Sequence, residues 1–219
     1  LRSFASLRMT FFTQSDVSVG LGGIYMINRE RVIEILEKTG ALKNGHFLLT
    51  SGLHSDRYIQ CAQVLQYPKY TEEICKGLAD EFREDNIDIV IGPATGGIIM
   101  AYEMARQLGA MAMFAEKEKE KRVLRRGFYV PKGAKVLVAE DVITTGGSVK
   151  EVIELIKEIG GIPAGVAVLV DRSNGKIDFG TKLRSALSLE VASYEETECP
   201  ICKKGNIPLE KPGSRGIKG

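Results

Sequence analysis

The sequence lacks a strong charge of either sign, because 30 basic residues nearly balance 28 acidic ones and leave a net charge of +2. A dedicated nucleic-acid-binding domain usually carries a basic face, so this balance argues against that class. The sequence also lacks an apolar run of the roughly 18 residues that a membrane-spanning helix needs. Its composition is 44% hydrophobic and 26% charged, as in a globular protein, and 219 residues suffice for one large α/β domain with a small appendage.

Cysteine is scarce, and its four positions are too scattered for the disulfide framework of a small secreted domain. We therefore expect a reducing, cytoplasmic environment. Cys61 and Cys75 lie among apolar residues and are predicted to be small core side chains. Cys199 and Cys202 have the spacing of a metal-ligand pair, but zinc needs about four ligands and the chain has no second such pair. We expect a tail without metal, and keep a site shared across a dimer as the alternative.

Residues 1–25 lack steady periodicity and differ in composition from the rest of the chain. They contain no unbroken apolar core of about 7 to 15 residues, which argues against a signal peptide. Arg2 and Arg8, against the single acid Asp16, leave a transit peptide open. We favour a simpler origin. The sequence before Met26 is what a ribosome-binding site would give if translated in frame, so we expect natural synthesis to start at Met26.

The expected organisation has three parts. Residues 1–25 form a non-native or disordered extension, and residues 26–194 form the folded domain. Residues 195–219 are rich in proline, glycine and lysine without periodicity, so we expect a loosely ordered tail.

Residues 136–148 are the stretch around which the chain is organised. Residues 136–139 are an apolar run without polar alternation, which is typical of a parallel strand covered by helices on both faces. Two adjacent carboxylates, Glu140 and Asp141, end the run. The turn that follows combines hydroxyls with glycines, and it contains Thr144, Thr145, Gly146, Gly147 and Ser148. Backbone N–H groups of such a turn at the start of a helix form a typical phosphate site.

A helix over residues 149–159 follows, because apolar residues recur there at helical spacing and Gly160 ends the pattern. Many turns of this kind join strands to helices without binding a ligand, so the turn alone leaves both interpretations equal. The acidic pair favours a ligand, since adjacent like charges at a strand end repel each other unless cations or hydroxyl donors gather there. A phosphate site beside carboxylates suits a ribose 5-phosphate.

A second glycine-rich turn, at residues 92–97, follows a predicted strand at 87–91 and precedes a predicted helix at 98–108. Ligands of open α/β sheets bind outside the carboxyl ends of the strands, where the two turns should face each other. The second turn is therefore predicted to hold the other end of the same ligand.

Hydrophobic periodicity predicts the remaining elements. They are helices at 28–40, with Asn28 as N-cap, and at 70–85, strands at 111–115, 162–170 and 186–192, and a small antiparallel element at 46–60 outside the main sheet. His46 and His54 fall in this last element, and we expect both to be surface or capping residues.

Residues 116–127 carry six bases against three acids. By composition this is a solvated loop. Its place after a strand end, beside two anion sites, favours a mobile loop that closes over a departing anion. Arg172, at the end of another predicted strand, is placed to bind a carboxylate on a base through two parallel hydrogen bonds. An exposed loop arginine is the alternative.

Residues 140–148 resemble the signature of the type I phosphoribosyltransferases. In that family the carboxylates bind the ribose hydroxyls and the turn binds the 5′-phosphate of 5-phosphoribosyl 1-diphosphate (PRPP). The similarity narrows to the orotate group through the Ser-Gly-x-x-Ser-x-x-Tyr stretch at 51–58, the basic loop, Arg172 and the tail around Cys199. It implies an α/β fold of the type I phosphoribosyltransferase kind, with a mostly parallel central sheet flanked by helices and a small N-terminal hood over the base.

The resemblance implies a Mg2+-dependent transferase that joins orotate to PRPP, giving orotidine 5′-monophosphate and diphosphate in pyrimidine nucleotide synthesis. It implies Lys117, Glu140 and Asp141 as catalytic residues. The implied PRPP-binding residues are Glu140, Asp141, Val142, Ile143, Thr144, Thr145, Gly146, Gly147, Ser148, Lys117, Lys121 and Arg122. The implied orotate-binding residues are Tyr58, Thr144 and Arg172. Mg2+ is expected to bind through PRPP without direct protein ligands. The basic loop is expected to act across a homodimer, with no nucleic-acid or membrane partner.

The chain departs from better-known members at residues 95–96 and at Thr50, where those proteins carry lysines. Its basic loop differs as well and leaves three candidates open for one role, namely Lys119, Lys121 and Arg122. Other functions are also weighed. A purine phosphoribosyltransferase would have no use for Arg172 or the hood, and a PRPP-sensing transcription regulator would add a basic DNA-binding domain. An unrelated nucleotide-binding protein would carry Gly-x-x-x-x-Gly-Lys-Ser/Thr, which is absent from the sequence.

Overall fold

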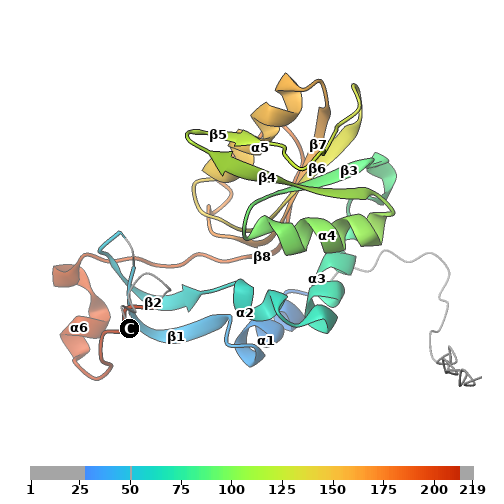
Figure 1. Ribbon diagram of the computed structural model, residues 1–219. Helices are drawn as coiled ribbons and strands as arrows, with labels where there is room; N and C mark the ends of the chain where they lie inside the picture. The colour runs from blue at the N-terminus through green and yellow to red at the C-terminus, as the bar shows by residue number, and fades with distance from the viewer. Residues whose placement is uncertain (1–27, 50, 213–219) are drawn as a thin grey trace, which may run out of the picture.

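The computed structural model describes residues 28–49 and 51–212. The extension at 1–25, the start at Met26 and the departure at Thr50 lie outside the described residues. Figure 1 shows an α/β layer above a smaller hood, with the C-terminal segment running along the hood.

A six-stranded sheet forms the main layer, in the order β5-β4-β3-β6-β7-β8. Its strands are β3 (Ile89–Pro93), β4 (Met111–Glu118), β5 (Lys121–Val123), β6 (Lys135–Ile143), β7 (Ile162–Asp171) and β8 (Leu183–Ser188). All neighbouring pairs are parallel except β4 with β5. The predicted mostly parallel sheet is confirmed, although its last strand begins and ends earlier than the sequence pattern indicates.

The central strand β6 contributes to two hydrophobic cores, one on each face of the sheet. Val136 and Val138 pack on one face with the helix α5 (Gly147–Glu158). Leu137 and Ala139 pack on the other face with the helix α4 (Gly97–Leu108). Successive side chains of a strand point to opposite faces, so an unbroken apolar run is what a strand covered on both sides requires.

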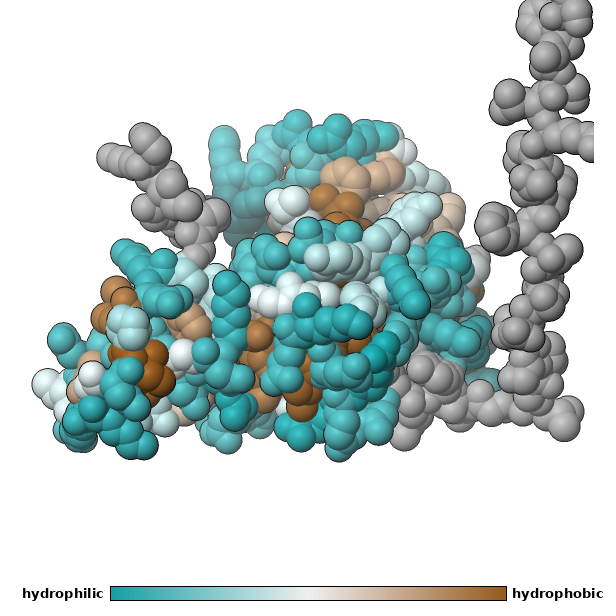
Figure 2. Space-filling view, turned by 90° about the horizontal axis from the view of Figure 1, so that it is seen from below, coloured by the Kyte–Doolittle hydropathy of each residue, from teal (hydrophilic) through white to brown (hydrophobic). Residues whose placement is uncertain are grey.

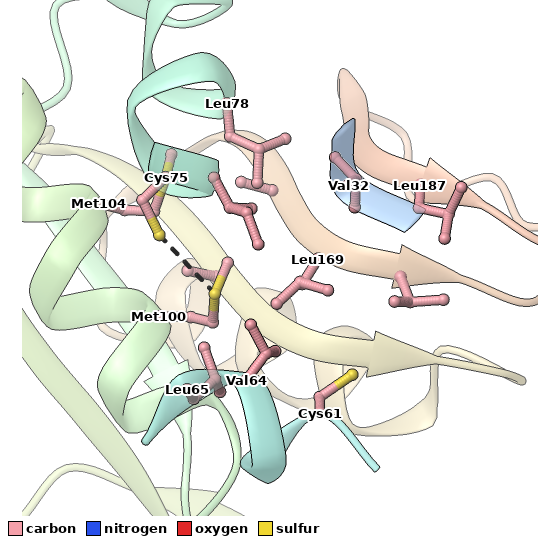
Figure 3. Packing of buried hydrophobic residues seen from close by; sticks show 14 of the residues in the cluster. Val32, Cys61, Val64, Leu65, Cys75, Leu78, Met100, Met104, Leu169 and Leu187 are labelled. Atoms are coloured by element: carbon pink, nitrogen blue, oxygen red, sulfur yellow. Dashed lines mark hydrogen bonds between the residues drawn. The ribbon is translucent and has the colours of Figure 1, made fainter. Parts of the chain in front are cut away.

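The core on the α4 face also receives α1 (Arg29–Lys38), α2 (Ala62–Leu65) and α3 (Pro68–Asp80). Cys61 and Cys75 are buried in it, as predicted, and the sulfur of Cys75 lies 3.8 Å from that of Met100 (Figure 3). Asn28 caps α1, because its side chain accepts a hydrogen bond from the backbone N–H of Glu30 at 2.6 Å. The helix predicted at 70–85 is wrong at its end, where a separate 3₁₀ turn spans Arg83–Asp85.

The hood is a two-stranded antiparallel hairpin of β1 (Leu42–Leu48) and β2 (His54–Ile59), as predicted. The prediction that His46 and His54 are surface or capping residues is wrong. Their exposed fractions are only 4% and 3%, and their rings contact each other edge to face. Both lie between the hairpin and the C-terminal segment, whose position the sequence pattern does not indicate.

The prediction of a loosely ordered tail is wrong for residues 194–212. A 3₁₀ turn spans Glu196–Glu198 and a short helix, α6, spans Pro200–Lys204. Backbone hydrogen bonds join the tail to both edges of the hood. Tyr194 exchanges two of them with His54, at 2.8 and 2.9 Å, and Glu210 pairs beside Phe47 in β1. These backbone hydrogen bonds to the hairpin order the tail, although its sequence has no helical or strand periodicity.

The basic segment 116–127 is not a plain loop, because most of its first half continues β4 and forms an antiparallel hairpin with β5. Ion pairs join its side chains to acids, including Arg126 with Glu116 at 3.1 Å and Arg125 with Glu118 at 2.6 Å. The loop assignment is therefore wrong for these strands. Movement of the segment stays a prediction.

The hood and the tail face outward on the side shown in Figure 2. That face is mainly hydrophilic, and its hydrophobic atoms lie in small patches, one of them at the α6 end. In the described part of the chain, no helix is long and apolar enough to cross a membrane.

Candidate active site

The two glycine-rich turns lie at the carboxyl ends of the adjacent strands β3 and β6, as the sequence predicts. The turn after β6 lines an open cavity of about 400 Å³. Its lining residues are Glu140, Val142, Ile143, Thr144, Thr145, Gly146, Gly147, Ser148, Val149 and Glu151. One contiguous stretch of sequence thus builds almost the whole wall of a polar cavity.

The turn needs its glycine at position 146 for two reasons. Gly146 has φ +73°, a left-handed conformation that glycine adopts without strain. A Cβ there would also lie 2.9 Å from the ring of Phe179. The helix α5 then starts at Gly147 without a side-chain cap, so the N–H groups of its first turn remain free for a ligand beside the cavity.

The two carboxylates occupy opposite sides of β6. Glu140 lines the cavity on the α5 side and is only 7% exposed. Asp141 lies against the second turn, where a Cβ on Gly96 would stand 2.7 Å from its Oδ1. Glycine at position 96 therefore lets the second turn approach the carboxylate of Asp141 closely. The two turns and the acidic pair thus lie together at the carboxyl-end edge of the sheet.

Burial gives this acidic pair an unusual electrostatic state. Burial, and secondarily the charge of Asp141, raise the pKa of Glu140 to about 8, while Arg122 opposes the increase. Burial also raises the pKa of Asp141. A cation or hydroxyl donors bound beside the pair would favour its ionised form, as expected for two adjacent carboxylates.

Arg122 is the basic residue that connects the two turns. Its side chain is 8% exposed and donates hydrogen bonds to the carbonyl of Ala94 at 3.0 Å and to Ser148 Oγ at 3.3 Å. It also pairs with Glu151 at 3.0 Å, and Lys117 pairs with the same carboxylate at 2.7 Å. Arg122 and Lys117 therefore stand at the cavity rim through a shared acid.

The other two candidates of the basic segment have different positions. Lys121 is exposed on β5, and Lys119 occupies the hairpin turn with φ +52°. Of the three residues that the sequence leaves open, Arg122 is the one that the structure places between the turns.

Arg172 follows the carboxyl end of β7, where its backbone N–H donates a hydrogen bond to the carbonyl oxygen of Ile143, the last residue of β6, at 2.9 Å. Its Nε is buried and has no hydrogen-bond partner among the described residues. Burial lowers the pKa of Arg172, and the nearby Cys61 and Tyr58 act in the opposite direction. A buried guanidinium with an unpaired donor, close to the hood residue Tyr58, suits an anionic ligand group.

Glu151 lines the cavity, although it is not among the site residues predicted from the sequence. Its position in the first turn of α5, next to the phosphate-type turn, is the signal that would have indicated a role at the rim.

Comparison with known proteins shows the family of this chain. Residues 62–179 match the model of the phosphoribosyl transferase domain. Orotate phosphoribosyltransferase of Caldanaerobacter subterraneus subsp. tengcongensis is 57% identical over 191 residues, which cover 87% of this chain and 100% of that protein. The protein of the same name from Thermoanaerobacter sp. (strain X514) is 57% identical over 86% of this chain and 99% of its own length.

A solved structure agrees. The crystal structure of orotate phosphoribosyltransferase from Aeropyrum pernix has a TM-score of 0.61 and 30% identity, and the match covers 72% of this chain and 93% of that one. The cavity-building signature lies within the region matched by the domain model. The chain belongs to the phosphoribosyltransferase family and, within it, to the orotate phosphoribosyltransferases.

Proposed function

We propose that this chain transfers the 5-phosphoribosyl group from PRPP to orotate, giving orotidine 5′-monophosphate and diphosphate in pyrimidine nucleotide synthesis. The observation that carries the proposal is one cavity in which a buried carboxylate and an uncapped helix start share a wall. A ribose phosphate offers hydroxyl donors to the carboxylate and a dianion to the helix start.

The reaction separates charge, and the site supports both signs. As the C1′–O bond of PRPP breaks and N1 of orotate approaches, positive charge grows on the ribose and negative charge on the diphosphate. Glu140 and Asp141 hold the ribose hydroxyls and favour the cationic sugar. N1 of orotate attacks directly, so the mechanism requires no protein nucleophile.

Residues 144–148 anchor the 5′-phosphate through hydroxyls and backbone N–H groups, which keeps C1′ in line with the incoming base. The second turn, at 92–97, faces the diphosphate. Arg122 spans the two turns and Lys117 stands beside it at Glu151, so both cations are close to the departing group. Exchange of Glu151 for diphosphate oxygens would bring these two side chains onto the leaving group.

The raised pKa of Glu140 supports Mg2+ at this edge, because nearby positive charge would favour the ionised form of the acidic pair. We propose that Mg2+ is held mainly by PRPP, with Glu140 and Asp141 binding the ribose hydroxyls next to it. When bound, the ion neutralises charge on the diphosphate.

Base choice follows from Arg172, Tyr58 and Thr144. Orotate carries a carboxylate that can accept from the guanidinium of Arg172, whose Nε is buried without a partner. Purine bases carry no such group. Tyr58 in the hood and Thr144 in the turn complete the proposed orotate contacts.

We also propose a homodimer in the cytoplasm. Two large apolar side chains on α4, Ile99 and Tyr102, are 46% and 65% exposed, which suits a partner surface. All four cysteines are free, which suits a reducing compartment. Mixing Lys117→Ala and Asp141→Asn subunits should restore part of the activity if the basic hairpin acts on the neighbouring site. Mixed dimers without recovery would mean that each subunit works alone.

The test of the activity is a base panel. The protein is incubated with PRPP, Mg2+ and one of orotate, uracil, hypoxanthine or adenine, and diphosphate release is measured. We expect release with orotate. Diphosphate release with a purine base but not with orotate would overturn the base assignment. If none of the four bases gave diphosphate release, a PRPP sensor would be favoured.

A further inference from the structure

A second cluster of chemically active side chains lies between the hood and the tail and shares no residue with the lining of the cavity. It contains His46 from β1, His54 from β2, and Cys199 and Cys202 at the start of α6. Their four ligand atoms all lie within 4.8 Å of one another. Backbone pairing of Tyr194 and Glu210 with the hood holds the tail in this position. The active-site mechanism uses none of the four residues.

The distances between these atoms approach the edges of a zinc tetrahedron. His46 Nε2 lies 2.9 Å from His54 Nδ1 and 3.5 Å from each cysteine sulfur, and Cys202 Sγ lies 3.2 Å from His54 Nδ1. Zn–N bonds of about 2.0 Å and Zn–S bonds of about 2.3 Å give tetrahedral edges of roughly 3.3 to 3.6 Å for pairs that include nitrogen. These four pairs need shifts of only a few tenths of an ångström, and the other two pairs lie within 4.8 Å, so small side-chain movements would let all four atoms bind one ion.

The protonation of His46 also favours a metal over a hydrogen-bonded cluster. Its Nδ1 lies 3.2 Å from the carbonyl oxygen of Ile207, which can only accept, so Nδ1 carries the proton and Nε2 presents a lone pair. That lone pair faces the other imidazole and both sulfurs, although it can accept from only one donor at a time. An ion at the centre would be bound by all four groups at once. A carbonyl on the second ring nitrogen is the usual support of a ligating histidine.

We propose that His46, His54, Cys199 and Cys202 bind one Zn2+ ion that fastens the C-terminal tail to the hood. Two imidazoles and two thiolates are a typical zinc ligand set, and four protein ligands leave no open position for a substrate. The role is therefore structural. The missing ligand pair of the Cys-x-x-Cys motif comes from two histidines of the same chain, so no partner subunit is needed.

The site has a consequence for the hood. His54 lies inside the 51–58 stretch, four residues before Tyr58, and it is hydrogen-bonded through its backbone to Tyr194 in the tail. Zinc would hold His54, the first residue of β2, between Tyr194 and the α6 segment that carries Cys199 and Cys202. Removal of the ion should release residues 195–212 and leave the cavity at β6 in place.

The direct test is metal analysis of the untagged protein, since a polyhistidine tag would itself bind zinc. Purification without chelator, followed by mass spectrometry of the elements, should give close to one zinc per chain. A Cys199→Ser, Cys202→Ser double variant should lose this zinc. Lys204→Ser changes an exposed residue of the same short helix to serine and should keep it.

A second measurement does not depend on the folding of a variant. Wild-type protein stripped with a chelator and refilled with Co2+ should show the visible absorption of a tetrahedral ion and charge transfer from thiolate. Limited proteolysis should cut within 195–212 in the stripped protein and not after zinc is restored.

Three results would overturn the proposal. One is wild-type protein that contains no zinc and binds neither added Zn2+ nor Co2+. Another is stoichiometric iron or copper in place of zinc. The third is a disulfide between Cys199 and Cys202 in protein freshly isolated under conditions that protect thiols. PRPP turnover in any of these cases would leave the proposed enzyme activity standing.

Discussion

The edge of the sheet at β6 and the cluster between hood and tail are both polar sites, but only the cluster has a full set of protein ligands for what it is proposed to bind. At β6, Glu140 has a raised pKa, Arg172 has an unpaired buried donor, and the cavity is open. Between hood and tail, four ligand atoms converge on a single point from three segments of the chain. The first arrangement lacks partners that a ligand can bring, and the second needs only an ion.

This difference separates transient from permanent binding. At the β6 site, buried charged groups lack partners until a substrate binds and supplies the compensating charge. Such a site can bind a substrate, catalyse its reaction and release the product in each cycle. A site with four protein ligands and no open position retains its ion and stabilises the fold. Changes at the two sites should therefore differ in kind, with activity lost at one and local stability at the other.

The largest effect is expected for Asp141→Asn, which removes a charge from the ribose site while keeping the shape of the side chain. Loss of one such electrostatic contact typically lowers kcat by about 10²–10³-fold. Thermal unfolding should change little, because burial already disfavours the charged form of Asp141. Steady-state assays beside calorimetric melting would measure both. Asp178→Asn, at an exposed residue outside the cavity, is the matched control. A loss of only a few-fold would mean that Asp141 does not contact the sugar.

Removal of the proposed zinc should have the opposite profile. If the free Zn2+ concentration is about 100 times the Kd for the folded chain, loss of the ion lowers the free energy of unfolding by about 2.7 kcal/mol. In a protein of this size, that loss lowers Tm by roughly 5–10 °C. The Kd for PRPP should change by no more than about two-fold, which is well below the roughly 1.4 kcal/mol that a tenfold change in affinity represents. Melting curves and calorimetric titration of the stripped and zinc-restored protein give the two numbers. Equal losses in both would show that the two sites are coupled.

Arg172→Ala should weaken orotate binding more than PRPP binding. Truncating a charge-assisted hydrogen bond costs about 1.5–3 kcal/mol, so the KM for orotate should rise by roughly 10–150-fold. Arg172→Lys keeps the charge without the planar fork and should recover only part of the loss. Initial rates with each substrate varied in turn separate the effects. Proportional increases in both KM values would argue against contact with the base.

The remaining effect concerns the pH dependence of stability and Glu140. The folded protein keeps this proton up to a pKa of about 8, whereas the unfolded chain loses it near 4.5. Between these values the folded state binds more protons, so stability should fall as pH rises, by at most about 1.4 kcal/mol per pH unit. Urea unfolding of wild type and Glu140→Gln from pH 5 to 8.5 measures the slope. Parallel curves for the two proteins would contradict the assignment of the proton to Glu140.

The sequence predicts which residues meet at the carboxyl end of β6 because these residues are local in the chain. Strand, acidic pair, turn and helix start are consecutive, and their order alone fixes which groups meet at the carboxyl end of β6. Arg172 could be placed because the carboxyl ends of parallel strands share one edge. The choice of Arg122 over Lys121 could not, since it depends on which face of a short antiparallel hairpin each side chain takes.

The hood–tail cluster is hard to predict for the opposite reason. Its ligands span residues 46–202, and the histidines carry no recognisable spacing of their own. What brings them together is backbone pairing of Tyr194 and Glu210 with the two edges of the hood. Hydrogen bonds of that kind leave no hydrophobic period in the sequence, which is why the tail looks unstructured by pattern and is ordered in the fold.

The most direct test of the central claim is calorimetric titration of PRPP with Mg2+ into wild type and into a Glu140→Gln, Asp141→Asn double variant. We expect one PRPP-binding site per chain in wild type and loss of binding in the variant, with the zinc content of both proteins unchanged. Undiminished PRPP binding by the folded variant would contradict it, because the sugar diphosphate would then bind somewhere other than the cavity at β6.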